Sequence, residues 1–278
     1  MYDATKTRWG KVIQHYGAEE NPRGLLELIY GEFGSGKTSY AASAKNCLFI
    51  DVDRGDNIAT RAAEHPYKTF EIDGLYENVK LFMRDMLDRK DVFDPEGGPY
   101  AGVKTLVIDS WTKLNEGLLV EIAGRDILEQ SRPDWDAYMR LKNRQVFLMG
   151  LLKEIAYKRG INIIVTALPV LEGDEAEKMK RDEKKASIKS GFSQVRGMPN
   201  LVGGYKKIIG AEFDEVHFLE TYQAASGVVR RMWTVPHNDY LAKSRLGLPS
   251  SIENPTFPRM LELAAEALAK RKNAVASK

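Results

Sequence analysis

The stretch GEFGSGKT contains four residues whose types and spacing suit the binding of phosphate groups. Gly31, Gly36, Lys37 and Thr38 fit the pattern G-x-x-x-x-G-K-[ST]. Glycines let the backbone curve so that successive N–H groups point at phosphate oxygens, and the N-terminus of a following helix favours the same anions. In such a loop the lysine contacts the β and γ phosphates, and the threonine hydroxyl ligates magnesium. This pattern, known as Walker A, predicts a site for ATP and Mg²⁺.

The segments on either side of this loop have the composition that the site requires. Leu25–Tyr30 is apolar, as in a buried strand, and Lys37–Lys45 contains several alanines, which favour a helix. A glycine-rich turn that matched by chance would not need this strand and this helix. The residues expected to contact the nucleotide are Gly31, Gly34, Ser35, Gly36, Lys37, Thr38 and Ser39.

A phosphate loop also needs a carboxylate at the end of another buried strand. Thr105–Ile108 is short and apolar, and Asp109 follows it directly. Asp109 therefore has the place of a Walker B aspartate, and we expect it to hold magnesium together with Thr38. The alternative is that Asp109 caps a helix that begins near Trp111.

Two further carboxylates follow a third apolar segment. Asp51 and Asp53 stand after Cys47–Ile50, at the carboxyl end of the predicted strand, where parallel α/β sheets place their ligands. Alternation along a strand makes the two side chains project the same way. The alternative is that both are aspartates of a tight turn.

Composition sets outer bounds on the protein class. The chain has 278 residues, of which 43% are hydrophobic and 29% charged, as expected for one large folded domain rather than a disordered chain. The longest apolar runs are too short to span a bilayer, and no signal peptide opens the sequence. The single cysteine excludes an internal disulfide, and the histidines show no metal-ligand spacing. We therefore expect a cytoplasmic protein with no membrane contact.

Several segments resemble RecA-fold ATPases in the order in which they occur. FIDVDRGDN resembles the RecA segment FIDAE, whose glutamate activates the attacking water, and Asp53 stands in its place. LAKSRLGLP resembles VKNKIAAP, whose lysines reach the γ-phosphate of a neighbouring subunit, and Lys243 and Arg245 occupy their places. The resemblance thus implies Lys37, Asp53, Lys243 and Arg245 as catalytic residues. Asp53 departs from the RecA pattern, because aspartate is one methylene shorter than glutamate, and we therefore expect slow hydrolysis. Thr166 is the best polar candidate for a sensor.

Among RecA relatives, the sequence is most similar to RecA-like nucleotide-binding proteins encoded by bacteriophages, some of which act in single-strand annealing. The resemblance implies an α/β fold: a RecA-like P-loop NTPase core with a mostly parallel central β-sheet flanked by helices. The expected organisation is an N-terminal arm or added strand (1–24), the ATPase core (25–250), and a C-terminal helix with a basic tail (251–278). A phage origin would place the protein in the cytoplasm of a bacterial host cell.

A basic segment follows the predicted sensor strand, Ile161–Ala167, where RecA keeps its principal DNA-binding loop. Between residues 178 and 207, nine Lys or Arg stand against two acids, among glycines and serines that suit a loop. The predicted DNA-binding residues are Lys178, Lys180, Arg181, Lys184, Lys185, Lys189, Arg196, Lys206 and Lys207. The alternative is a solvated helix with paired charges. A second candidate for DNA contact is the segment Gly124–Trp135.

The long helix predicted over Asp136–Arg159 has an amphipathic pattern. Its expected core residues are Met139, Val146, Met149 and Ile155. Further strands are predicted over Asp214–Leu219 and Arg230–Val235, and a terminal helix over Phe257–Lys270.

These features predict a Mg-ATP-dependent ATPase that acts on single-stranded DNA in recombination, strand annealing or replication. The resemblance implies a homo-oligomeric ring or filament with active sites between subunits, and a single-strand-binding protein or another recombination or replication protein as partner. One alternative is an assembly factor that ATP switches with little turnover. Another is an AAA+-type helicase loader or remodeller, although AAA+ strands usually end in Asp-Glu and this one ends in Asp109 and Ser110. A small-molecule kinase would need an acceptor pocket that we could not identify.

Overall fold

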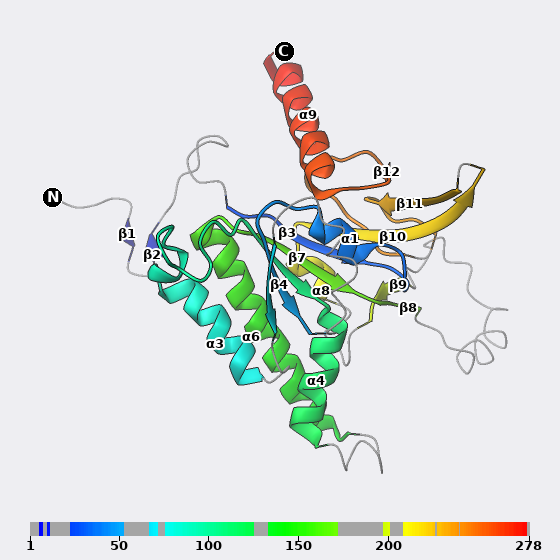
Figure 1. The fold of residues 1–278 in the computed structure, drawn as a ribbon. Coiled ribbons are helices and arrows are strands. Elements are labelled where there is room, and N and C mark those ends of the chain that lie inside the picture. The colour runs from blue at the N-terminus through cyan, green and yellow to red at the C-terminus, as the bar shows by residue number, and fades with distance from the viewer. Residues whose placement is uncertain are drawn as a thin grey trace, which may run out of the picture.

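The computed structural model describes residues 6–7, 10–11, 23–52, 67–71, 76–124, 133–171, 197–200, 208–225, 227–238 and 240–276. An eight-stranded sheet forms the centre of this part of the chain, with helices on both faces (Figure 1). In spatial order the strands are β12 (Ser251–Glu253), β11 (Gly227–Trp233), β10 (Glu215–Ala224), β3 (Leu26–Tyr30), β7 (Asn162–Ala167), β6 (Thr105–Asp109), β4 (Cys47–Asp51) and β5 (Tyr67–Glu71).

The strands from β10 to β5 are all parallel, whereas β11 and β12 continue the sheet in antiparallel pairs. Parallel strands that are covered on both faces need apolar side chains on both, and β3, β4 and β6 are buried along their whole length. The predicted fold class, α/β with a mostly parallel central sheet flanked by helices, is confirmed.

Helices cover the two faces of the sheet unequally. The larger apolar cluster joins one face to α3 (Tyr76–Asp88), α4 (Trp111–Ala123), α6 (Trp135–Arg159) and α8 (Ile209–Glu212). The smaller cluster joins the other face to α1 (Lys37–Ala42) and α9 (Phe257–Ala276). Alternation along β3 explains the division, because Leu28 and Tyr30 belong to the larger cluster and Ile29 to the smaller.

The remaining elements are short. They are the strand pair β1 (Lys6–Thr7) and β2 (Gly10–Lys11), the strand pair β8 (Pro169–Leu171) and β9 (Gly197–Pro199), and the 3₁₀ helix η2 (Asp91–Phe93). Among the described residues, no helix combines the length and the apolar composition that crossing a lipid bilayer requires.

Helix α6 buries a different stripe of residues from the predicted one. Met149 and Ile155 lie in the core as expected, but Met139 and Val146 are exposed. The buried positions are Ala137, Leu141, Gln145, Leu148, Met149, Leu152, Ile155 and Ala156. The prediction named Met139 and Val146 as core, whereas burial follows the spacing of three and four residues set by packing against α3 and α4.

A cluster of charged side chains lies inside the protein where β3 meets β10. His217 Nδ1 lies 2.8 Å from Glu27 Oε1, and its Nε2 lies 3.1 Å from Glu215 Oε2. All three side chains are fully buried. The Tyr40 hydroxyl, on α1, donates to the same Glu27 oxygen at 2.7 Å. The cluster therefore joins the helix after the phosphate loop to two neighbouring strands.

The two glutamates keep the buried histidine charged. Burial alone would lower the pKa of His217, but the hydrogen bonds and charges of Glu215 and Glu27 outweigh it and raise the pKa to about 9. Burial would likewise raise the pKa of Glu215, and the bond from His217 lowers it instead. Both shifts favour an ion pair between His217 and Glu215 in a region that water does not reach.

The only cysteine of the chain lies at the start of β4. The Cys47 thiol is buried and donates to the carbonyl oxygen of Ala44 at 2.7 Å. Burial raises the pKa of this thiol to about 12.

The buried ion pair predicts a specific dependence of stability on pH. Because the folded pKa of His217 is raised, its contribution is fully present below about pH 6.5, the ordinary histidine value, and is lost as the pH rises through 9. Replacing His217→Gln should lower the free energy of unfolding by about 3–5 kcal/mol at pH 6. The difference between wild type and variant should shrink between pH 7 and 10, as measured by urea unfolding.

A matched control is His237→Gln, which removes a half-buried histidine that stacks on Trp233. The free energy of unfolding of this variant should decline above pH 7 as that of the wild type does. A difference between wild type and His217→Gln that stayed constant from pH 6 to 10 would contradict the charged state of His217.

Candidate functional site

The phosphate loop lies between β3 and α1, at the carboxyl edge of the sheet. Gly34 and Gly36 have φ angles of +74° and +96°, which favour glycine, and Gly36 is the N-cap of α1. A Cβ atom at Gly31 would lie 2.0 Å from the carbonyl oxygen of Leu219 on β10. The pattern of glycines therefore has a steric cause at both ends of the loop.

Lys37 folds over its own loop. Its Nζ donates to the carbonyl oxygens of Gly31 at 2.8 Å and Glu32 at 2.9 Å. The ammonium group is thus held above the turn that the glycines make, as the phosphate-binding interpretation of the loop requires.

Asp109 connects the loop to two strands of the sheet. Its Oδ2 accepts a hydrogen bond from Thr38 Oγ1 at 2.7 Å, and its Oδ1 accepts one from Thr166 Oγ1 at 2.5 Å. The predicted sensor candidate therefore touches the predicted Walker B carboxylate. The alternative of Asp109 as a helix cap is not what the structure shows, because Ser110 is the N-cap of α4 and accepts from Lys113 N at 3.3 Å.

A cavity of about 320 Å³ opens above these groups. Its lining is Phe33, Gly34, Gly36, Lys37, Thr38, Ser39, Asp109, Ser110, Leu168 and Arg230. Five of the seven predicted nucleotide contacts, Gly34 and the residues from 36 to 39, are among these. Gly31 and Ser35 are not: both are buried, and the Ser35 hydroxyl lies under the loop beside Gly31.

The donor set fits a magnesium ion bound with a nucleotide. Mg²⁺ prefers hard oxygen ligands and usually takes only one or two from the protein, the others coming from phosphates and water. Thr38 donates its proton to Asp109, which leaves the lone pairs of its oxygen for a cation. No group of three or more His, Cys, Asp or Glu in the described part of the chain could hold a metal without such a nucleotide.

Asp51 lies next to this site. It is the register partner of Asp109 in the parallel pair of β4 and β6, and Val52 N donates to Asp109 O at 2.9 Å. Asp51 is buried and is not among the residues that line the cavity.

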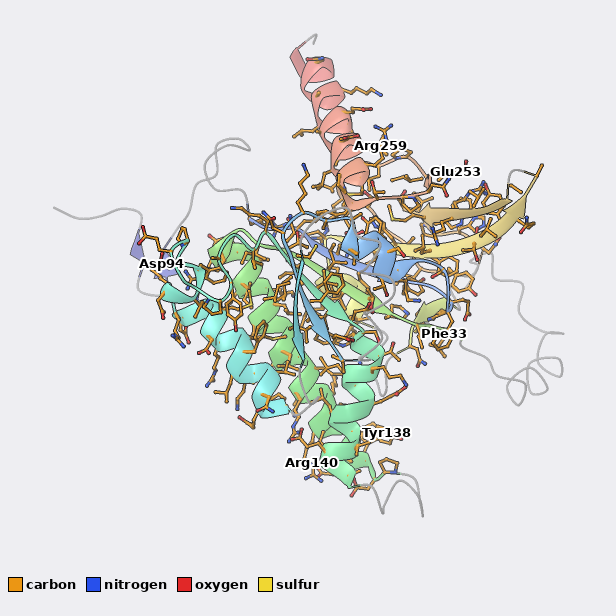
Figure 2. All side chains as sticks on the ribbon, in the orientation of Figure 1. Phe33, Asp94, Tyr138, Arg140, Glu253 and Arg259 are labelled. Carbon is orange, nitrogen blue, oxygen red and sulfur yellow. The ribbon has the colours of Figure 1, made fainter. Side chains whose placement is uncertain are left out.

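The sequence analysis missed four residues of the cavity, Phe33, Ser110, Leu168 and Arg230. Phe33 is 80% exposed and lies on the same side of the molecule as the β10–β11 hairpin (Figure 2). Leu168 follows the predicted sensor strand, so its position could have suggested it. Arg230 is distant in sequence and reaches the loop only through the hairpin.

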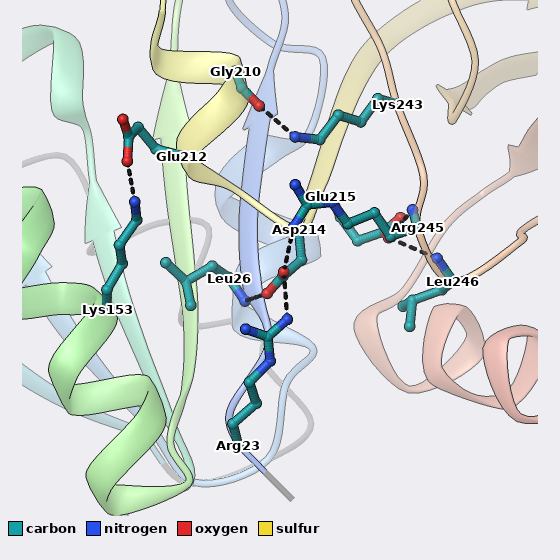
Figure 3. Close-up of polar contacts among 10 residues, drawn as sticks. All are labelled: Arg23, Leu26, Lys153, Gly210, Glu212, Asp214, Glu215, Lys243, Arg245 and Leu246. Carbon is teal, nitrogen blue, oxygen red and sulfur yellow. Dashed lines mark hydrogen bonds and ion pairs between the residues drawn. The ribbon is translucent and has the colours of Figure 1, made fainter. Parts of the chain in front are cut away.

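Lys243 and Arg245 contact residues of α8 and of the segment that leads into β10 (Figure 3). Lys243 Nζ donates to the carbonyl oxygen of Gly210 at 2.6 Å, and Arg245 pairs with Asp214 at 3.1 Å. Asp214 also accepts from the backbone of Leu26, at the amino end of β3, whereas the loop leaves the carboxyl end. Burial, and then the charge of Arg245, lower the pKa of Lys243.

Some predicted residues lie outside the described part of the chain. They are Asp53 and the nine basic residues Lys178, Lys180, Arg181, Lys184, Lys185, Lys189, Arg196, Lys206 and Lys207. Of the second candidate for DNA contact, residues 125–132 are also outside it, and Trp135 is 79% exposed. The roles of these residues stay predictions.

Comparison with known proteins places this site in a family. No curated protein matches the chain. Among solved structures it is similar to the crystal structure of the RadB recombinase, with 14% sequence identity, covering 84% of this chain and 87% of the other, at a TM-score of 0.43. The AAA domain family matches residues 23–246, which include the loop, Asp109 and Thr166. With the fold and the phosphate loop, this match confirms the predicted RecA-like P-loop ATPase, and the protein is a member of the AAA domain family.

Proposed function

We propose that this protein is a Mg-ATP-dependent ATPase that acts on single-stranded DNA in recombination, strand annealing or replication. The observation that carries the proposal is the convergence of Lys37, Thr38 and Asp109 on one cavity at the end of a parallel sheet. Lys37 and Thr38 follow a loop whose conformation favours glycine, and Asp109 comes from a distant part of the sequence. Their types match the binding of a triphosphate with magnesium.

Different residues of the site would bind different parts of Mg-ATP. The N–H groups at the start of α1 and the Lys37 ammonium would hold the β and γ phosphates. Thr38 and Asp109 would hold magnesium, which when bound neutralises charge on the phosphate oxygens. Thr166 fixes the orientation of the Asp109 carboxylate through a hydrogen bond from its buried hydroxyl. Asp53 would take the proton of the attacking water.

Active sites between subunits would explain the placement of the second basic pair. Arg245 lies at the amino end of β3, opposite the loop, and Lys243 donates to the carbonyl oxygen of Gly210, so neither is held at the loop of its own chain. Arg245 has 59% of its side chain exposed and is therefore accessible to a neighbouring subunit. A homo-oligomer, either ring or filament, would bring this end of one subunit to the phosphate loop of the next.

The first test concerns ATP binding. Lys37→Ala removes the charge nearest the β and γ phosphates, and we expect ATP affinity to fall at least about tenfold. Calorimetry at a fixed Mg²⁺ concentration measures the effect. Lys45→Ala is the control, because it removes an exposed lysine shortly after the same helix. Wild-type affinity and turnover in Lys37→Ala would refute the site.

The second test concerns hydrolysis. Asp53→Asn should bind ATP as the wild type does but hydrolyse it at least about tenfold more slowly, since a general base contributes about 10²- to 10⁴-fold. Steady-state phosphate release gives the rate. Asp51→Asn is the comparison, because Asp51 is the last residue of β4 and stands two positions before Asp53. If Asp51→Asn loses hydrolysis and Asp53→Asn does not, the base is the other carboxylate.

The third test concerns DNA. Changing Lys184, Lys185 and Lys189 together to Ala should weaken binding to single-stranded oligonucleotides of any sequence. The slope of log affinity against log salt should become shallower by about 2, at about 0.7 for each lost phosphate contact. Fluorescence anisotropy at several salt concentrations measures both, and ATP binding should not change.

A charge-matched control for this variant removes three exposed lysines elsewhere, Lys90, Lys104 and Lys158. It should keep the wild-type slope. If the two triple variants behaved alike, the basic segment would be a solvated surface, and an ATP-switched assembly factor would become the better explanation. Hydrolysis that does not respond to single-stranded DNA would favour the same alternative.

A further inference from the structure

The β10–β11 hairpin extends past the phosphate loop. Strand β3 pairs with β10 only as far as Tyr30 and Phe218, and beyond this point β10 pairs with β11 up to Ala224 and Gly227. The carbonyl oxygen of Leu219 touches the start of the loop at Gly31. The hairpin therefore runs along one side of the loop as a wall, and Figure 1 shows β10 and β11 beside α1.

Arg230 reaches the loop from this wall. A Cβ atom at Gly36 would lie 2.5 Å from Arg230 Nε and 2.6 Å from its Cδ, so the arginine side chain lies against the backbone of the loop. Arg230 also lines the cavity with Lys37, Thr38 and Asp109. Arg230 is otherwise exposed to solvent, so a ligand in the cavity can reach its guanidinium.

The backbone of Arg230 is held on both sides. It is the register partner of Thr221 on β10. On its other side, its N–H donates to Asn254 Oδ1 at 3.2 Å, and its carbonyl oxygen accepts from Asn254 N at 2.7 Å. The start of the side chain is therefore fixed, and only its outer part is free to follow a ligand.

Arg231, the next residue along the strand, has the contacts of an arginine with a structural role. Arg231 projects to the other face, where it donates to Glu253 and to the Tyr222 hydroxyl, both at 2.7 Å. For the Arg230 guanidinium, the described part of the chain provides neither a hydrogen bond nor an ion pair. A guanidinium with five donors beside the N-terminus of α1 suits the oxygens of a polyphosphate.

We propose that Arg230 binds the phosphates of a nucleotide held on the phosphate loop of its own subunit. This inference rests on the proposed nucleotide site and adds to it a cation from a different element. The loop lysine and Arg230 would then hold the phosphate chain from two sides. Because the arginine comes from the hairpin, nucleotide binding would also tie β10 and β11 to the loop.

The test compares two neighbouring arginines. Arg230→Gln should weaken the binding of a nonhydrolysable ATP analogue about tenfold or more, because a charge-assisted hydrogen bond to phosphate is lost. Arg231→Gln has the same change in net charge and should bind the analogue as the wild type does. Calorimetry gives the affinity, and thermal unfolding without nucleotide verifies that each variant is folded. Arg230→Lys should fall between Arg230→Gln and the wild type.

The outcomes separate this inference from the proposed function. If the wild type binds the analogue and Arg230→Gln binds it equally well, the role of Arg230 is refuted and the nucleotide site stands. If the wild type does not bind the analogue, both are refuted. An equal loss in Arg230→Gln and Arg231→Gln would also refute the specific role, because it would reflect the charge or shape of the hairpin.

A mixture of variants tests whether Arg230 acts within its own subunit. Lys37→Ala and Arg230→Gln, mixed in equal amounts, should show no tight sites, because each subunit lacks one of the two cations. If Arg230 served a neighbouring loop instead, some interfaces in the mixture would contain both cations. Recovery of tight binding would therefore refute action within the subunit.

Discussion

A charged histidine held between two buried glutamates connects the parts of this protein that surround the phosphate loop. Glu27 belongs to β3, whose carboxyl end leads into the loop, and Glu215 and His217 belong to the adjacent β10. Such a pair costs a large desolvation energy, which only close and complementary contacts offset. The register of β3 against β10 is therefore constrained, because a shift by one residue would separate the charges.

The same glutamates extend this constraint in two directions. Glu27 accepts a hydrogen bond from the hydroxyl of Tyr40, on the helix that begins at the loop. Glu215 accepts the backbone N–H groups of Arg245 and Leu246 at 2.7 and 3.0 Å. The helix behind the nucleotide cavity and the segment that carries Lys243 and Arg245 are thus attached to one buried cluster, although they lie at different ends of the sheet.

The sequence was sufficient to predict those features that local pattern determines. The strand before the loop, the glycines and the Asp109 strand all follow from short motifs and composition, and they match the structure within a residue or two. Features that depend on tertiary packing were not predictable in this way. Met139 and Val146 are as apolar as their buried neighbours, and only the position of α3 and α4 decides which side of α6 is covered. Arg230 carries no motif at all, because its place at the site depends on how far the β10–β11 hairpin extends.

The burial of Cys47 determines how the protein responds to thiol reagents. A thiol reacts as its thiolate, and with a pKa of about 12 this group has almost none at neutral pH. Its position at the start of β4, inside the smaller apolar cluster, also keeps reagents away in the folded state. Alkylation of Cys47 would therefore require local opening of the sheet. The native cysteine thus acts as a chemical reporter of that opening, and in the folded protein it would not compete for reagent with a cysteine introduced elsewhere for labelling.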